Sequence, residues 1–367
     1  MIRLLVVDDS ALMRKLLGGV FAAEGDFEVA FARDGEEALA EHARFHPDVV
    51  TLDVNMPSLD GLGCLDRIML DRPTPVVMVS SLTAEGAEIT LDAMERGAID
   101  FVVKPGGALS LEMDRLGPLI VQKVRAAARA RLRPTLRLAE RVRALSGGSG
   151  GEPARRSQKP ARLEAAKPKP KSATPGTVEG IVLVGTSTGG PPALDALLSR
   201  LPADFPWPVV VAQHMPGSFT GPLARRLDGL CALPVQEASR PMPLRSGNVY
   251  IGRGDADVTL ARRPSGLVVQ PVPAHADYLW HPSVDRLVMS AFDLVEPARL
   301  VGVLMTGMGR DGASAMTEMR ALGGRTIAES EETAVVWGMP GELVRAGGAS
   351  VVAPLEAIAD ALLDMVP

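Results

Sequence analysis

Short apolar runs alternate with helix-like stretches along most of this 367-residue chain, and few folds accommodate such a pattern. In residues 1–122 the apolar runs fall at residues 4–8, 28–32, 49–53, 76–80 and 101–103. Strands this short, joined by segments long enough for a helical crossover, predict a parallel sheet with helices on both faces, a doubly wound α/β fold. Ligands bind such sheets at the carboxyl ends of the strands.

The alternation resumes at Gly180 and predicts a second doubly wound domain, residues 178–367, with a short-stranded insertion around residues 245–272. The candidate strands of this part are residues 181–185, 209–213, 249–251, 258–260, 267–270, 300–306 and 325–327. The length of the chain agrees with two or three domains.

Residues 123–177, between the two domains, differ from both in charge and composition. A helical pattern runs from Leu116 to Leu145, and a Ser/Gly-rich and then a Lys/Pro-rich stretch follow, which are typical of flexible linkers. Residues 123–171 carry a net charge of +12, whereas residues 1–122 carry −11. Because the stretch has neither aromatic side chains to stack on bases nor a base-reading motif, we expect a basic, solvated tether and no nucleic-acid partner.

The remaining composition narrows the class of protein. No apolar run approaches the ~20 residues of a membrane span. The strand-like start is interrupted by Asp8 and Asp9, which a signal peptide would not contain. Two cysteines, Cys64 and Cys231, are too few for a disulfide framework or a zinc site. We therefore expect a cytoplasmic protein in which both cysteines serve packing.

Polar residues gather at the strand ends of the first domain. Asp8 and Asp9 end the first predicted strand, Asp53 ends the third, Ser80 the fourth and Lys104 the fifth. Three carboxylates at one point repel one another unless a cation lies among them, and hard oxygen ligands suit Mg²⁺. With a metal ion and a lysine to neutralise phosphoryl oxygens, the pattern predicts phosphoryl transfer onto a carboxylate.

On these residues, residues 3–120 resemble a response-regulator receiver domain with a flavodoxin-like sheet. The resemblance implies that Asp53 accepts a phosphoryl group from a histidine kinase, with Mg²⁺ held by the three acids. Ser80 and Lys104 would act as the switch hydroxyl and lysine. Phe101 stands where the family has its aromatic switch, although simple core packing also explains an aromatic residue there.

A second pattern follows the apolar run Ile181–Val184. Residues 185–190 read Gly-Thr-Ser-Thr-Gly-Gly and contain the G-x-S-x-G pattern of a nucleophile elbow. This pattern puts Ser187 on a tight turn at the carboxyl end of a strand, beside a helix N-terminus. The alternative is a glycine-rich turn that binds phosphate or nothing.

A nucleophilic serine needs a base, and the second domain offers three histidines. His214 ends a strand expected to lie beside that of Ser187, so it is favoured over His275 and His281.

The base in turn needs an acid to orient it. Asp311 follows the strand at residues 300–305 and shares its strand-end position, which favours it over other acids of the domain. The rivals are Asp255, Asp257, Asp277 and Asp285. The order serine, histidine, aspartate differs from that of an α/β-hydrolase, so a different topology is expected.

In this arrangement Ser187 would attack an acyl carbon, His214 would accept and return the proton, and Asp311 would orient the imidazole. Backbone N–H groups near Thr188 and Met308 are expected to stabilise the oxyanion.

Residues 178–365 resemble the catalytic domain of the CheB family of chemotaxis protein-glutamate methylesterases, which implies a Rossmann-like sheet. The matching segments are Gly185–Gly190, Gln213–Pro216, Pro282–Asp285, Thr306–Gly312 and Gly338–Pro340. Thr186, where the family usually has alanine, and the sequence around Trp280 and His281 depart from its pattern.

The resemblance implies a phosphorylation-activated esterase, with no cofactor for the hydrolysis, that demethylates glutamate methyl esters on chemoreceptors and deamidates certain glutamines. The protein would meet the membrane only through those receptors, and the unphosphorylated receiver would cover the active site. Three alternatives stay open. They are the same chemistry in a non-chemotaxis signalling array, a second domain that only binds a ligand or protein, and a receiver-tethered DNA binder.

Overall fold

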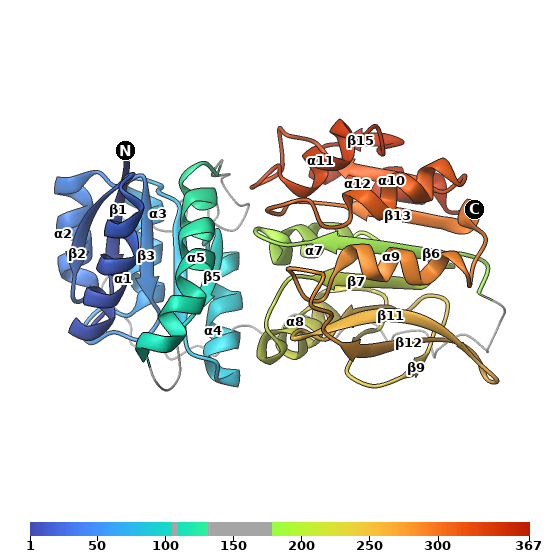
Figure 1. Ribbon diagram of the computed structural model, residues 1–367, viewed down its shortest axis with the longest axis horizontal. Coiled ribbons are helices and arrows are strands. Elements are labelled where there is room, and N and C mark those ends of the chain that lie inside the picture. Colours follow the sequence, from blue (N-terminus) through green and yellow to red (C-terminus); the bar gives the residue numbers. More distant parts are fainter. Residues whose placement is uncertain (105–108, 131, 133–177) are drawn as a thin grey trace, which may run out of the picture.

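The computed structural model of the chain describes residues 1–104, 109–130, 132 and 178–367. These residues form two α/β domains, which lie side by side in Figure 1. Among them, no helix is long and apolar enough to cross a membrane.

The first domain is a parallel sheet in the order β2-β1-β3-β4-β5, covered by helices on both faces (Figure 1). Its strands are β1 (Ile2–Val7), β2 (Phe27–Ala32), β3 (Val49–Asp53), β4 (Val76–Ser80) and β5 (Asp100–Val103). Its helices are α1 (Ala11–Glu24), α2 (Gly35–Phe45), α3 (Gly61–Asp71), α4 (Ala84–Glu95) and α5 (Leu109–Ala128). The strand order is the flavodoxin-like one, so the expected doubly wound sheet is confirmed.

Sequence chemistry explains where these helices begin. The residue before each of α1 to α4 accepts a hydrogen bond from the third amide of the helix through its side chain. These residues are Ser10, Asp34, Asp60 and Thr83. Such caps satisfy amides that have no partner within the helix. Every residue of β3 and β4 is buried, as expected where helices cover both faces of a parallel sheet.

The second domain is built on a parallel sheet in the order β15-β14-β13-β6-β7-β10-β8. The strands are β6 (Ile181–Thr186), β7 (Val209–Gln213), β8 (Val235–Ala238), β10 (Val249–Gly252), β13 (Leu300–Leu304), β14 (Arg325–Glu329) and β15 (Val351–Ala353). The helices are α7 (Gly190–Leu198), α8 (Gly217–Leu230), α9 (Val284–Phe292), η1 (Pro297–Arg299), α10 (Ala313–Ala321), α11 (Met339–Arg345) and α12 (Leu355–Met365). The order reverses between β6 and β13, which creates a switch point at their carboxyl ends.

The insertion forms a separate antiparallel sheet in the order β11-β12-β9. It consists of β9 (Met242–Pro243), β11 (Ala256–Arg263) and β12 (Gly266–Pro273), and α9 packs against β11. Two of the strands expected for the second domain, residues 258–260 and 267–270, therefore belong to this hairpin. The predicted strand 249–251 is instead β10 of the main sheet.

One expectation from the sequence needs correction. The helical pattern predicted from Leu116 starts earlier and is interrupted, because α5 begins at Leu109 and ends at Ala128, before the turn at Arg129. The part of that prediction over residues 133–145 lies outside the described residues. The segments β8, β15 and α8 were not anticipated from the apolar pattern, because the two strands are short and α8 contains Pro222. The predicted flexible linker lies outside the described residues.

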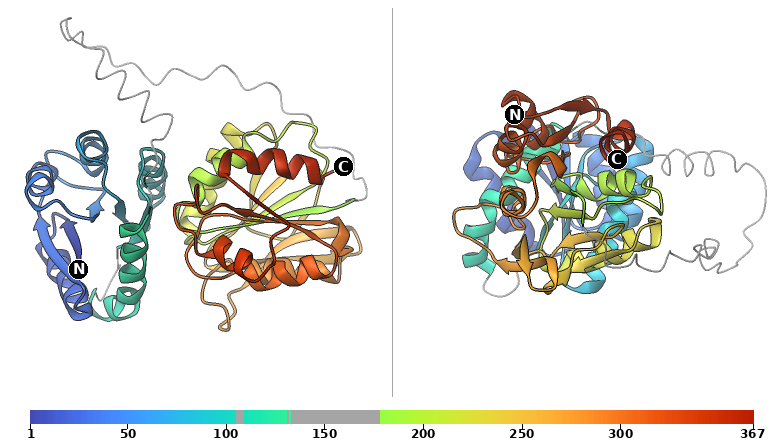
Figure 2. Two further views of the ribbon diagram at one scale, coloured as in Figure 1. Left: turned by 90° about the horizontal axis from the view of Figure 1, so that it is seen from above. Right: turned by 90° about the vertical axis from the view of Figure 1, so that its right-hand side faces the viewer.

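The two domains meet through the α4–β5–α5 side of the first sheet, which faces α7 and α8 (Figures 1 and 2). Phe101 of β5 stacks on Phe219 of α8, with ring centroids 4.4 Å apart. Arg226 of α8 forms ion pairs with Glu95 of α4 and with Asp195 of α7.

Candidate active site

Ser187 lies in a three-residue turn between β6 and α7. Gly189 has a φ of +76°, which favours glycine. A Cβ at Gly190 would collide with Oε1 of Gln213. That amide accepts a hydrogen bond from the Thr186 hydroxyl at 2.6 Å and donates one to the Ser187 carbonyl at 3.0 Å. The glycines thus allow the turn to close onto β7, and Gln213 holds it there.

His214 and Asp311 form a buried pair at the same edge of the sheet. Nε2 of His214 lies 2.8 Å from Oδ2 of Asp311, and the two side chains are 3% and 10% exposed. The carboxylate also accepts hydrogen bonds from the Ser283 hydroxyl at 3.0 Å and from the amides of Val284 and Asp285 at 2.6 and 3.0 Å. Burial opposes ionisation of Asp311, but the hydrogen bonds from His214 and the amides outweigh it, and its pKa is lowered.

Nδ1, the other ring nitrogen of His214, is buried and has no hydrogen-bond partner within the described part of the chain. The His214 amide donates to the Thr186 carbonyl at 3.0 Å, so the imidazole begins directly beside the serine turn. Nε2 faces Asp311, so Nδ1 is the ring nitrogen that remains for a further hydrogen bond. The hydrogen bond from serine to histidine is not formed among the described residues, as is common in active sites without substrate.

The indole of Trp280 covers the imidazole of His214. The two rings are stacked, with centroids 5.6 Å apart and an angle of 11° between their planes. The sequence prediction did not assign Trp280 or Ser283 a role. The only available signal was the Pro282–Asp285 segment among the matching motifs.

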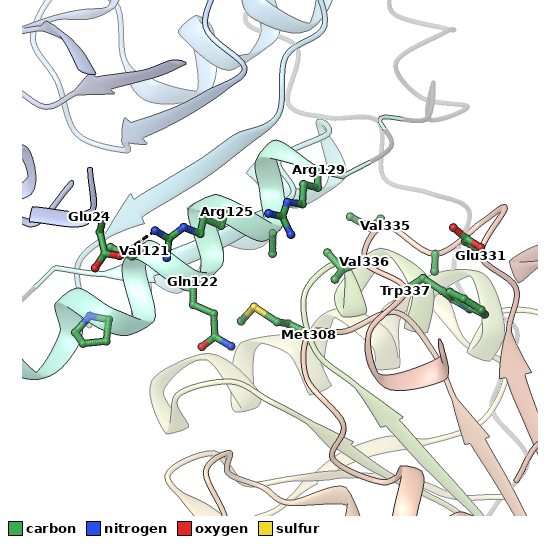
Figure 3. A pocket seen from close by; sticks show the side chains of 13 residues that line it. Glu24, Val121, Gln122, Arg125, Arg129, Met308, Glu331, Val335, Val336 and Trp337 are labelled. Atoms are coloured by element: carbon green, nitrogen blue, oxygen red, sulfur yellow. Dashed lines mark hydrogen bonds and ion pairs between the residues drawn. The ribbon is translucent and has the colours of Figure 1, made fainter. Parts of the chain in front are cut away.

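The loop that follows β13 lies against the serine turn. The Ser187 amide donates to the Thr306 carbonyl at 3.0 Å, and a Cβ at Gly307 would lie 2.7 Å from Cβ of Ser187. Met308, the next residue, lines a cavity of about 610 Å³ between α5 and the loop around Val336 (Figure 3). Gln122 of α5 extends toward Met308 in the same view.

Thr188 contacts the first domain. Its hydroxyl donates a 2.5 Å hydrogen bond to Oδ2 of Asp100, and both residues are buried. Oδ1 of the same carboxylate lies 2.8 Å from Nζ of Lys123. The residue after the serine is therefore held by the neighbouring domain.

The rival histidines and acids have other partners. His281 pairs with Asp257, and Nδ1 of His275 lies 3.6 Å from Asp277. Asp255 accepts the Gly217 amide at 2.8 Å, which places it at the start of α8. Asp285 accepts the Ala315 amide at 2.9 Å and so holds α9 against α10. Burial, followed by the neighbouring Asp311 carboxylate, raises the pKa of Asp285 to about 6.

The acids predicted for the first domain also come together. Asp8, Asp9 and Asp53 each place one carboxylate oxygen within 4.8 Å of those of the other two. Nζ of Lys104 lies 2.6 Å from Oδ2 of Asp53 and 3.1 Å from Oδ2 of Asp8. Burial raises the pKa of Asp53, with the Lys104 ammonium acting in the opposite direction.

This donor set fits a hard divalent cation. Oδ2 of Asp8 is buried, with the Lys104 ammonium at 3.1 Å as its polar contact among the described residues, and the other two acids add carboxylate oxygens. Three carboxylates with one ammonium leave a net negative site, which a divalent ion would neutralise. Ser80 ends the neighbouring strand, and its hydroxyl donates to the Gly86 carbonyl at 3.2 Å.

Comparison with known proteins assigns a family to each of the two domains. A family model described as CheB methylesterase matches residues 182–362, and one described as response regulator receiver domain matches residues 4–112. A protein-glutamate methylesterase/protein-glutamine glutaminase 2 of Rhodopseudomonas palustris is 59% identical over 364 residues, which are 99% of this chain and 98% of that protein. The chain belongs to the CheB methylesterase family.

Other members of the CheB family support this assignment. A protein-glutamate methylesterase/protein-glutamine glutaminase 3 of Rhodospirillum rubrum is 53% identical over 99% of this chain and 95% of its own length. The crystal structure of the Thermotoga maritima CheB methylesterase catalytic domain matches with a TM-score of 0.50 and 36% identity, over 52% of this chain and all of that one. The chain is accordingly an enzyme with a receiver domain in front of a methylesterase domain, as the resemblance implied.

Proposed function

We propose that Ser187, His214 and Asp311 are the catalytic residues of a serine esterase that hydrolyses glutamate 5-O-methyl esters on chemoreceptors. The observation that carries the proposal is the 2.8 Å contact between His214 and Asp311 at the strand edge that also carries the half-buried Ser187. A buried imidazole held by a carboxylate, beside a serine on a tight turn, has the arrangement needed for acyl transfer.

The reaction proceeds in two acyl-transfer steps. Nδ1 of His214 takes the proton of Ser187 as its oxygen attacks the ester carbonyl, and then gives that proton to the departing methanol. Water attacks the acyl-enzyme with the same imidazole as base, which releases the glutamate carboxylate. Asp311 holds the ring and stabilises its charged form. A glutamine amide can follow the same route and release ammonia, which accounts for deamidation.

We assign the oxyanion site to the backbone amides near Thr188 and Met308. Thr188 follows Ser187 in the chain. Met308 follows Gly307, whose backbone lies close to Ser187. Each such donor is typically worth about 3–4 kcal/mol in the transition state.

The receiver domain regulates this site by phosphorylation of Asp53, with a histidine kinase as the donor. Asp8, Asp9 and Asp53 would hold Mg²⁺, which when bound neutralises charge on the phosphoryl oxygens. Ser80 and Lys104 would contact the phosphoryl group, and the change would reach β5 and Phe101. The Phe101–Phe219 stack at the interface supports a resting state in which the receiver rests on the catalytic domain. We place the protein in the cytoplasm, where it would meet membranes only through receptors.

The test is methanol release from methylated chemoreceptor, with and without a small phosphodonor. The wild type is expected to release methanol, the phosphodonor to stimulate it, and Ser187→Ala to abolish it. Release that survives in Ser187→Ala would exclude Ser187 as the nucleophile. A folded wild type that labels with a serine-directed phosphonate but releases nothing would indicate another ester substrate, including one in a non-chemotaxis signalling array.

A further inference from the structure

Asp257 of the insertion hairpin and His281 of the loop before α9 form a second imidazole–carboxylate pair, which the proposed triad does not use. Asp257 of β11 is fully buried, and its Oδ1 lies 2.9 Å from Nδ1 of His281. Its Oδ2 accepts a 2.5 Å hydrogen bond from Arg286. A buried carboxylate needs such partners, because removing a charge from water is costly. Asp257 therefore ties the segment 281–286 to the hairpin.

The segment that Asp257 holds is the one that holds Asp311. Oδ1 of Asp257 accepts the amide of Ser283 at 2.7 Å, and the hydroxyl of Ser283 donates to Asp311 at 3.0 Å. The next two amides, of Val284 and Asp285, also donate to Asp311. The path between the two carboxylates thus passes through one residue, whose backbone serves one acid and whose side chain serves the other.

A second route leads from Asp257 to His214. Trp280, whose indole stacks on the imidazole of His214, directly precedes His281, the partner of Asp257. Burial opposes the ionisation of Asp257, but the hydrogen bonds from His281, Ser283 and Arg286 outweigh it, and its pKa is lowered. The carboxylate is therefore charged at neutral pH.

We propose that Asp257 is a positioning residue for the Asp311–His214 pair, acting through the segment 280–285. The proposal rests on the hydrolytic function proposed above. Asp257 touches neither the substrate nor the reacting atoms. Loss of its charge weakens the hydrogen bonds that it accepts from His281 and the Ser283 amide, and the Asp311 carboxylate then loses the fixed orientation in which it holds the imidazole.

The test compares Asp257→Asn with Asp255→Asn, the same change two residues earlier, at an exposed acid whose hydrogen bond among the described residues is with the Gly217 amide. For Asp257→Asn, kcat for methanol release is expected to fall about 10- to 100-fold with KM within about twofold, because small misplacements of catalytic groups cost this much. The acidic limb of the pH profile should move to lower pH, since a loosened carboxylate stabilises the imidazolium less. Asp255→Asn should match the wild type.

The charged groups around this relay limit what can move the pH profile. Arg286 and His281 face Asp257, while Asp285 lies beside Asp311. None of them is altered in either variant. A shift found only in Asp257→Asn is therefore assigned to the loss of the Asp257 charge.

A second measurement does not depend on turnover. The NMR signal of the His214 ring N–H that faces Asp311 is recorded, and its exchange with water is expected to be faster in Asp257→Asn than in the wild type. If this difference is found although the wild type releases no methanol, the proposed function fails and the positioning role stands. An active wild type whose kcat and His214 N–H exchange are unchanged in Asp257→Asn would overturn the inference, as would an equal loss in Asp255→Asn.

Ser283→Ala keeps the inference testable if Asp257→Asn does not fold. This variant removes the hydroxyl that donates to Asp311 and leaves the amide that donates to Asp257. The relay predicts a shift of the acidic limb in the same direction. A folded Ser283→Ala with the wild-type limb would also overturn the inference.

Discussion

The Thr188 hydroxyl donates a 2.5 Å hydrogen bond to Asp100 across the interface between the two domains. Thr188 directly follows the proposed nucleophile, and Asp100 directly precedes Phe101, which stacks on Phe219. Lys123 holds the same carboxylate from α5. A movement of β5 would therefore reach the serine turn with no residue in between.

Thr188→Val tests whether this contact restrains the enzyme. Valine keeps the shape of threonine and its backbone amide, but leaves the buried Asp100 without one donor, which typically costs about 1–3 kcal/mol. We expect basal methanol release to rise roughly five- to tenfold, with the phosphodonor-stimulated rate unchanged, because the closed population is reduced. Equal basal rates in the variant and the wild type would show that the contact does not restrain the active site.

Two ion pairs between α4 and α8 offer a matched comparison. The Glu95–Arg226 side chains are 23% and 17% exposed, whereas those of Glu88–Arg225 are 67% and 65% exposed. Water and salt screen exposed pairs, and breaking a sheltered pair leaves a charge poorly solvated. We expect Glu95→Gln to raise basal methanol release several-fold, because the sheltered Arg226 loses a partner, and Glu88→Gln to leave the release within about 1.5-fold. The reverse order would locate the restraint elsewhere.

Removal of Mg²⁺ should affect the phosphorylation site of the first domain and not the hydrolytic site of the second. Chelation with EDTA is expected to abolish stimulation by the phosphodonor, because Asp8, Asp9 and Asp53 would no longer have a counter-ion for the incoming phosphoryl group. The basal rate should stay the same, since protein side chains carry the proposed hydrolysis. Asp53→Asn should behave in the same way without EDTA. The measurement is methanol release in parallel with phosphoprotein formation.

Gly307 is required at its position by the approach of the serine turn. A Cβ there would lie 2.7 Å from Cβ of Ser187 and would also collide with Sδ of Met339. Gly307→Ala is expected to lower kcat about 100-fold, because it displaces the loop that carries Met308. Gly229→Ala, where a Cβ meets nothing within 4 Å, serves as the control and should retain the wild-type rate.

The receiver domain should lose stability at mildly acidic pH because of His42. Burial, with the nearby Arg72 guanidinium, lowers the pKa of His42 to about 4 from the usual 6.5, and Nε2 lies 2.8 Å from the Thr74 hydroxyl. Between pH 4 and pH 6.5 the His42 imidazole binds a proton in the unfolded chain but not in the folded chain. The stabilisation is therefore complete above pH 6.5 and is lost as the pH falls toward 4, by at most about 3 kcal/mol.

Hydrogen exchange of the β3 amides as a function of pH measures this loss. His42→Gln should flatten the dependence between these two pH values, although the variant is expected to be less stable at neutral pH. The exposed His46, replaced by Asn, should leave it unchanged. A dependence that persists in His42→Gln would assign the proton uptake to other groups.

Local sequence pattern was sufficient for the strands of the two main sheets, except for the edge strands β8 and β15, and for placing the candidate site residues at shared strand ends. Apolar periodicity identifies buried strands, and polar residues at strand ends must meet wherever parallel strands share an edge. This reasoning brought Asp8, Asp9, Asp53 and Lys104 together correctly. It also selected His214 and Asp311 from several rivals, and their 2.8 Å contact agrees with that choice.

Sequence pattern could not predict contacts between residues that are far apart in the chain. The Thr188–Asp100 contact spans 88 residues of the chain and joins two domains, so no periodicity within either one reveals it. Three further contacts follow from how α9 packs on the insertion hairpin. They are the contact of His214 Nε2 with Asp311, the stacking of Trp280 on His214, and the hydrogen bond of Ser283 to Asp257. Sequence pattern thus predicted the chemistry of the site, while the packing of distant segments determines its geometry. Secondary structure has a short-range signature, and contacts between distant elements do not.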